Sequence, residues 1–289
     1  MKPAFQKDDA FLADVDRVLQ SGGRSIWWLG QSGFLIAQNG RAILLDPYLS
    51  DSLTKKYANT DKPHVRITER VVDPSFLGLT CSGKIDLITS SHNHTDHFDP
   101  DTLIPLLALV DLTTDLVVPA ANCDASAARL GAHFSIILKF LDDGACLTIG
   151  DIEIHGIAAA HNTVERDENG HCRFLGYVIR WGPLTLYHSG DTLLHDQLAP
   201  SLRRFEIDLA LLPINGDKPE RRVAGNLDGP QAAQLAHDIG ARCVIPCHYD
   251  MFEFNTASPD EFVAACARLN QKCQVLRNGE GWDFSPLLS

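Results

Sequence analysis

A short loop at residues 91–97, which carries three histidines and an aspartate, is the feature that most constrains the fold of this 289-residue chain. The stretch reads Ser-His-Asn-His-Thr-Asp-His and directly follows the apolar run 85–89, which has the composition of a buried strand. Imidazoles and carboxylates are natural ligands of zinc and comparable divalent ions. A loop that leaves a strand can aim these side chains at one point. We therefore predict that His92, His94, Asp96 and His97 are metal ligands.

One loop supplies at most four ligands, so a working site needs further side chains from other strand ends. Three residues elsewhere in the chain each follow an apolar run, and these are His161, Asp191 and His248. Loops at strand ends are where binding residues concentrate. We predict that these three residues complete the metal site.

The order of the predicted elements indicates the fold class. A helix from Asp8 or Asp9 to Leu19 is followed by strands at 25–30, 33–37 and 42–46, and then by a strand at 85–89, a helix at 102–110, a strand at 116–119 and a helix at 121–130. The second half repeats this order, with strands at 147–158, 174–181, 184–188 and 208–214, a helix at 229–239, a strand at 243–247, a helix at 259–269 and a strand at 274–276. Sheets followed by helices, twice, predict one α/β domain over 1–289 with halves of roughly 1–145 and 146–289. The expected architecture is an αββα sandwich, in which two mixed β-sheets lie face to face with helices on both outer faces.

Composition excludes several classes of protein. The chain is 45% hydrophobic and has a formal net charge of −12 without a basic stripe, which argues against nucleic acid as a partner. The chain has no long apolar run and no apolar N-terminal segment, so we expect no membrane partner and a cytoplasmic location. Its eight cysteines contain no C-x-x-C pair and read as reduced core thiols. A small-molecule substrate is the expected partner, and the oligomeric state is left open, a homo-oligomer included.

The motif H-x-H-x-D-H, a later His, an Asp after a strand and a final His together resemble the metallo-β-lactamase superfamily. The resemblance covers most of the chain and implies the same αββα sandwich. It implies one metal site at His92, His94 and His161, a second at Asp96, His97 and His248, and Asp191 as a bridge between them. Asp46, in Leu-Leu-Asp-Pro, matches a superfamily motif whose carboxylate orients ligand histidines, although a turn Asp before proline is an equal alternative.

Within that superfamily, the strings at 27–30, 151–155, 186–191 and 244–250 resemble the L-ascorbate-6-phosphate lactonase branch. The chain departs from that branch in its shorter length and in carrying His161. The resemblance implies hydrolysis of a small, anionic lactone or ester. A phosphodiesterase of the same fold is the alternative enzyme, and a non-catalytic metal-binding regulatory protein is the alternative from another class.

The expected chemistry is attack by a metal-bound hydroxide, because a divalent ion lowers the pKa of bound water from about 15.7 toward roughly 7. Asp96 is expected to take up the proton of the nucleophile. His188 and Asp250 rank first as the acid that protonates the leaving group, with His195 and Tyr249 as alternatives. The ligands are N and O donors, which permits one or two ions of zinc or manganese, and also iron.

An anionic substrate needs a positive anchor besides the metal. Lys218, Arg221 and Arg222 follow the strand expected at 208–214, and the sequence therefore predicts that they bind the substrate anion.

Overall fold

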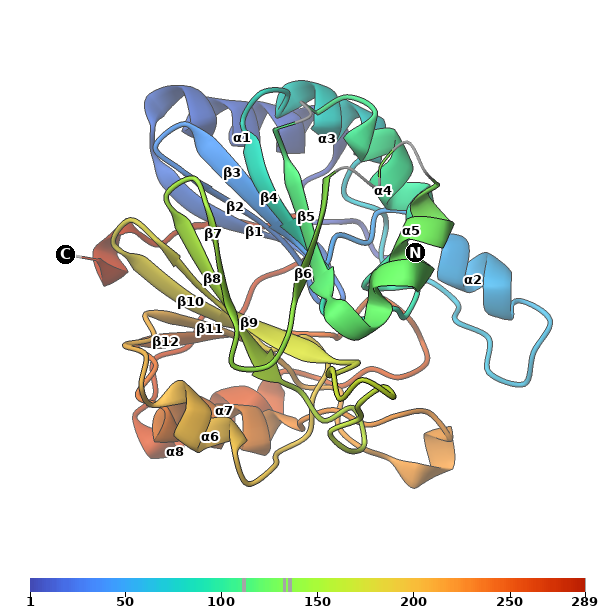
Figure 1. Cartoon of the computed structure of the whole chain (residues 1–289), viewed down its shortest axis with the longest axis vertical. Helices are drawn as coiled ribbons and strands as arrows, with labels where there is room; N and C mark the ends of the chain where they lie inside the picture. Colours follow the sequence, from blue (N-terminus) through green and yellow to red (C-terminus); the bar gives the residue numbers. More distant parts are fainter. Residues whose placement is uncertain (111–112, 132–133, 135–136, 289) are drawn as a thin grey trace.

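The computed structural model describes residues 1–110, 113–131, 134 and 137–288 of the chain. Two β-sheets stack face to face, and helices cover the outer face of each sheet (Figure 1). This arrangement confirms the predicted αββα sandwich. No helix in these ranges is both long and apolar enough to cross a membrane.

The first sheet combines an antiparallel meander with parallel strands. Its strand order over the described residues is β13(Gly281–Asp283), β1(Arg24–Gly30), β2(Gly33–Gln38), β3(Arg41–Leu45), β4(Ile85–Thr89), β5(Asp115–Pro119) and β6(Leu138–Leu141). The strands from β3 to β6 pair in parallel, so their carboxyl ends lie at the same edge. The helices on its outer side are α1(Asp8–Ser21), α3(Pro74–Thr80), α4(Pro100–Leu107) and α5(Cys123–Leu130).

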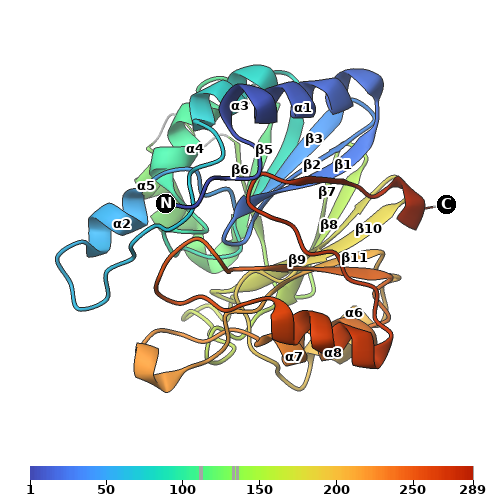
Figure 2. The ribbon, with the colours of Figure 1, turned by 180° about the vertical axis from the view of Figure 1, so that it is seen from behind.

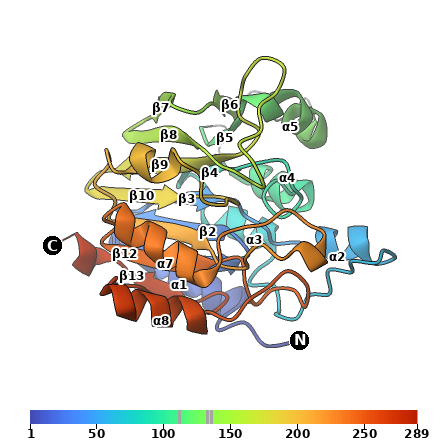
Figure 3. The ribbon, with the colours of Figure 1, turned by 90° about the horizontal axis from the view of Figure 1, so that it is seen from below.

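The second sheet has the same mixed character. Its order is β12(Cys243–Cys247), β11(Leu209–Pro213), β10(Leu184–His188), β9(Leu175–Trp181), β8(Ile152–Ala158) and β7(Cys146–Ile149). The helices on its outer side are α6(Leu198–Leu202), α7(Gly229–Asp238) and α8(Asp260–Leu269), which Figure 3 shows from below. A capping box between Asp228 and Gln231 starts α7, since each side chain binds the other residue's backbone N–H. The remaining short elements are α2(Ser52–Tyr57), η1(Ala120–Asn122), η3(Pro219–Arg221) and η4(Ser285–Leu287).

Strand β1 illustrates how both faces of a sheet become buried. Ile26 and Trp28 point into the core between the two sheets, whereas Trp27 and Leu29 point toward the helical layer. The indole of Trp27 also donates a hydrogen bond to Asp14 of α1 at 2.8 Å. Because successive side chains alternate between faces, a strand covered on both sides is apolar throughout.

Two expected strands differ from the structure. The run 147–158 forms two strands, β7 and β8, because the chain turns at Gly150, whose φ is +59°. Residues 274–276 form no strand, and Cys273 makes only an isolated bridge to Val244. The last strand is β13, which pairs with β1, so the second half of the chain contributes a strand to the first sheet.

Several described elements were not expected from the sequence, and they are α2, α3, β6, α6 and β13. The helix expected at 102–110 is α4, which begins at Pro100 and ends at Leu107. The cysteines are free thiols, and most of them are buried as expected. Cys123 and Cys273 are partly exposed, and Cys146 is exposed at the start of β7.

Candidate metal centre

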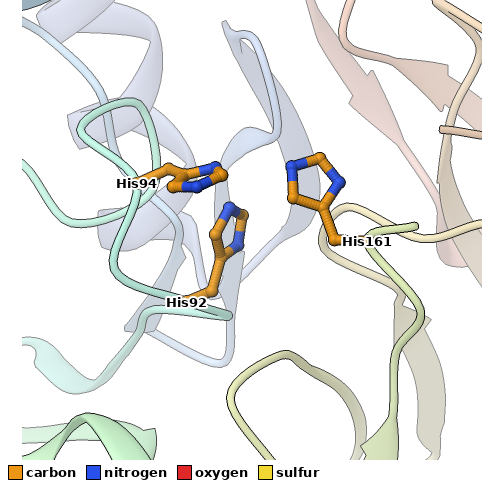
Figure 4. Close-up of side chains that lie close together, drawn as sticks. All are labelled: His92, His94 and His161. Carbon is orange, nitrogen blue, oxygen red and sulfur yellow. The ribbon is translucent and has the colours of Figure 1, made fainter. Parts of the chain in front are cut away.

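The predicted ligands all lie just beyond the carboxyl ends of strands that face one another across the sandwich. The loop after β4 carries His92, His94, Asp96 and His97, and the other three ligands follow β8, β10 and β12. Figure 4 shows His92 and His94 on one loop with their rings turned toward His161, which comes from the opposite sheet. The two sheets therefore each supply part of one site.

Two groups of three side chains converge closely enough to hold metal ions. In the first group, His92, His94 and His161 each place a ring nitrogen within 4.8 Å of the others. In the second group, ligand atoms of Asp96, His97 and His248 meet the same limit. These are the two triads that the family resemblance implies.

Asp191 lies between the two groups. Its Oδ1 is 3.4 Å from His97 Nε2, and its Oδ2 is 3.8 Å from His161 Nε2 and 3.5 Å from His248 Nε2. Asp191 also joins His92 and His97 in a third convergent group. A carboxylate in this position can contribute one oxygen to each of two ions.

Buried hydrogen bonds orient the ligand rings. Asp46 is fully buried, and its Oδ2 lies 2.6 Å from His97 Nδ1, which must donate because a carboxylate only accepts. The other ring nitrogen, Nε2, is thereby left free for a metal. His161 is oriented in the same way, since its Nδ1 lies 3.1 Å from the carbonyl oxygen of Gly225. Asp46 thus holds a ligand histidine in the structure and is more than a turn residue.

The unpaired atoms of the site fit a divalent cation. Among the described residues, His92 Nε2, His97 Nε2 and Asp191 Oδ1 are buried and make no hydrogen bond. Buried polar atoms without a partner are rare and costly, and a cation would satisfy all three. The donors are imidazole nitrogens and carboxylate oxygens, which zinc, manganese and iron all accept.

The protonation equilibria of the site reflect its mixture of buried imidazoles and carboxylates. Burial lowers the pKa of His92 well below its ordinary range and that of His94 to about 4. Burial opposes ionisation of Asp96 and Asp191 as well, but His97 and His248 outweigh it and hold both carboxyl pKa values well below their usual range. The carboxylates therefore stay charged, and His92 and His94 stay neutral, as metal ligands must.

Residues 25–248 match the family model described as the beta-lactamase superfamily domain. The chain belongs to this superfamily.

Known members resemble the chain over most of its length. A protein from Rubrobacter xylanophilus named UPF0173 metal-dependent hydrolase is 28% identical over 267 residues, which covers 90% of this chain and 96% of that protein. The metallo-beta-lactamase fold protein YhfI from Bacillus subtilis superposes with a TM-score of 0.62 at 18% identity. The match covers 90% of this chain and 99% of the YhfI chain. An isothiocyanate hydrolase from Delia radicum gut bacteria gives a TM-score of 0.68 at 17% identity, with coverage of 90% and 99%. The two structures show that the fold is shared.

A cavity of about 380 Å³ opens above the paired triads of this superfamily member. Its floor includes His94, Asp96 and Asp191, and its walls come from two segments that are far apart in the sequence. One is the α2 segment, residues 52–64, and the other is the loop 222–224 after η3; both lie at the same end of the molecule (Figure 2). Lys56, Tyr57, Lys62 and His64 of the first segment line the cavity. Lys56 belongs to a basic pair, Lys55-Lys56, that the sequence offers as a possible anion contact, whereas no motif marks Tyr57, Lys62 or His64.

The residues expected to protonate the leaving group lie outside the cavity, and their side chains have other partners. This corrects the assignment of His188 and Asp250 as the acid. His188 is fully buried and its Nε2 donates to the carbonyl oxygen of Ser32 at 2.9 Å. Asp250 pairs with Lys2 at 2.5 Å, and Tyr249 donates to the carbonyl oxygen of Leu276. None of these side chains lines the cavity.

His195 is also unsuited to that role, since its Nε2 donates to the carbonyl oxygen of Ala158 at 3.0 Å.

The residues expected to bind the substrate anion are only partly placed as predicted. Arg222 lines the cavity, but Lys218 does not. Arg221 turns its guanidinium to Asn215, Thr256 and the cavity residue Asn255, so it supports the wall without facing the substrate.

Replacing Asp191 by Ala should remove more metal than replacing any other ligand, because Asp191 is within reach of both triads. We expect elemental analysis to find up to two ions per wild-type chain, a loss of one ion in His161→Ala, and a loss of both in Asp191→Ala. The exposed His237 of α7 provides the matched control, and His237→Ala should retain the wild-type content. Full metal content in Asp191→Ala would contradict the arrangement.

Proposed function

We propose that this protein is a metal-dependent hydrolase whose substrate is a small, anionic lactone or ester. The observation that carries the proposal is the cavity above the two triads, whose walls bear the cationic side chains of Lys56, Lys62 and Arg222. The shared name of relatives such as the Rubrobacter xylanophilus protein, metal-dependent hydrolase, supports the hydrolytic part. The sequence strings that resemble the L-ascorbate-6-phosphate lactonase branch support the substrate class.

Three cationic side chains line the cavity although the chain as a whole carries a net charge of −12. Lys62 donates to the backbone carbonyl of Arg222, which ties the two walls together, and Lys56 lies 3.2 Å from Thr95 Oγ1 beside the metal ligands. Arg222 pairs with the exposed Asp61 at 2.5 Å. A local positive field in an acidic protein attracts an anion to the one place where it can react.

The residues of the cavity floor and those of its walls have different roles in the proposed reaction. A divalent ion in this site supplies a strong nucleophile at neutral pH, because it lowers the pKa of water to about 7. Asp96 is 14% exposed, lines the cavity and accepts a hydrogen bond from Gln31 at 3.0 Å, so its carboxylate is placed to accept the proton of the attacking water. The cations of the walls hold the anionic end of the substrate.

His64 is the residue we assign to the leaving group. Its Nδ1 donates to the carbonyl oxygen of Lys62 at 3.0 Å, which leaves Nε2 to exchange a proton with the substrate. Its ring lies among Tyr57, Phe252 and Phe254, and burial lowers its pKa below the ordinary value. The proton that Asp96 accepts from the attacking water then passes to Nε2 of His64, which is neutral at pH 7, and from there to the departing oxygen.

Phosphodiester hydrolysis is the second candidate function, because the same three cations would suit a phosphodiester. The two candidates separate in one experiment. The purified protein, supplied with zinc or with manganese, is assayed against sugar-lactone phosphates, carboxylated esters and phosphodiesters. We expect turnover of lactones or esters that carry a negative charge and its loss in His94→Ala. Turnover of phosphodiesters alone would favour the second candidate, and no turnover with any metal would argue for a non-catalytic metal-binding protein.

Lys62→Ala should raise KM for an anionic substrate and leave kcat nearly unchanged, because Lys62 binds the charge and does not touch the reacting bond. Lys218→Ala is the matched control, since Lys218 is exposed and does not line the cavity. Steady-state kinetics with a charged ester and its uncharged analogue measure both effects. The anchoring role would be refuted if KM rose equally in Lys62→Ala and Lys218→Ala. It would also be refuted if Lys62→Ala raised KM equally for the charged ester and for its uncharged analogue.

His64→Gln should slow hydrolysis of esters with poor leaving groups by about 100-fold, the lower range for general acid–base catalysis. The reduction should be smaller for a nitrophenyl ester, whose leaving group needs no proton. A plot of rate against leaving-group pKa for both proteins checks this expectation. Parallel lines would show that His64 does not transfer the proton.

A further inference from the structure

A second cluster of metal-binding side chains lies on the hairpin formed by β7 and β8. The cluster contains Cys146, Glu153 and His155, and one donor atom of each lies within 4.8 Å of the other two. The hairpin lies at the far end of the sandwich from α2, which forms one wall of the catalytic cavity (Figures 1 and 3). The cluster is therefore separate from the paired triads.

The pairing of the strands places the three side chains together. Cys146 and His155 are direct partners in the antiparallel ladder of β7 and β8. Glu153 precedes His155 by two residues, so both side chains project from the same face. The opposite face of β8 carries Ile152 and Ile154, which are fully buried in the core. A shift in register would expose these isoleucines, so the core fixes the geometry of the cluster.

Neighbouring side chains hold the ligands in position. The ring of His155 packs against Phe205 at a centroid distance of 4.9 Å, and the guanidinium of Arg180 lies above the Phe205 ring. Arg180 also contacts Glu153 Oε1 at 3.2 Å, which is the oxygen that meets His155 Nε2. Within the described part of the chain, the other carboxylate oxygen, Oε2, makes no hydrogen bond or ion pair and is available to a cation.

We propose that Cys146, Glu153 and His155 form a binding site for a thiophilic divalent cation such as zinc. A thiolate, an imidazole and a carboxylate are the ligands that zinc binds in proteins, and water can fill the fourth position. Binding releases the thiol proton of Cys146 and replaces the hydrogen bond between His155 and Glu153. His155 Nε2 already lies 3.8 Å from Cys146 Sγ, so the ligands need little rearrangement.

Titration with Co²⁺ tests this site separately from the catalytic centre. The paired triads contain no cysteine, so a thiolate-to-cobalt charge-transfer band in the near ultraviolet reports only on a cysteine site. We expect the band in the wild-type protein and in Cys123→Ser, where a partly exposed thiol of α5 is removed as the matched control. The band should be absent in Cys146→Ser. No band in the wild-type protein, or an unchanged band in Cys146→Ser, would overturn the proposal.

Alkylation of Cys146 gives a second readout that needs no substitution of the thiol. Zinc at roughly ten times its Kd should slow modification of Cys146 by iodoacetamide about tenfold, since only the free fraction reacts. The same zinc concentration should leave Cys123 unprotected, and His155→Ala should abolish the protection of Cys146. Equal alkylation rates with and without zinc would contradict the site, whatever the activity of the enzyme.

Discussion

The buried carboxylate of Asp46 joins the end of β3 to the metal-binding loop after β4. Its Oδ1 accepts from the backbone N–H of Ser91 at 2.9 Å, and its Oδ2 accepts from the Ser91 hydroxyl and from His97. Ser91 in turn lies directly against Gly190, where a Cβ would come within 2.4 Å of the Ser91 Cβ. Because Gly190 precedes Asp191, this chain of contacts sets the distance between the ligands of the first sheet and those of the second.

The scaffold and the cavity walls place different demands on the sequence. The ligands follow strands whose registers are fixed by a core buried on both faces, so their positions are determined to within the precision of packing. The walls come from α2 and from the loop after η3, which contribute few residues to that core. Such loops can change their side chains without disturbing the metal centre, which suits them to determine which substrate is bound.

The sequence was most informative where metal-binding side chains directly follow an apolar strand. The seven predicted ligands come together because each occupies a strand end, and the αββα sandwich followed from the order of the elements. The direction of a single side chain was not predictable in this way. His188 is the last residue of β10 and points into the protein toward Ser32, because the strand pleat and not the distance along the chain decides which face it occupies.

The wall formed by the α2 segment was not predictable for a related reason. Lys56, Lys62 and His64 lie in a stretch without apolar periodicity, and only the tertiary fold brings them over the metal ligands. β13 was not predicted because its three residues, which include Gly281, are too few to show the alternating pattern of a strand. Only the pairing with β1 identifies this segment as a strand.

Anomalous diffraction from crystals grown with zinc or manganese is the most direct test of a two-ion centre. The account predicts two anomalous peaks, one bounded by His92, His94 and His161 and one by Asp96, His97 and His248, with the carboxylate of Asp191 between them. A single peak outside these triads, or no peak at the ends of these strands, would contradict it.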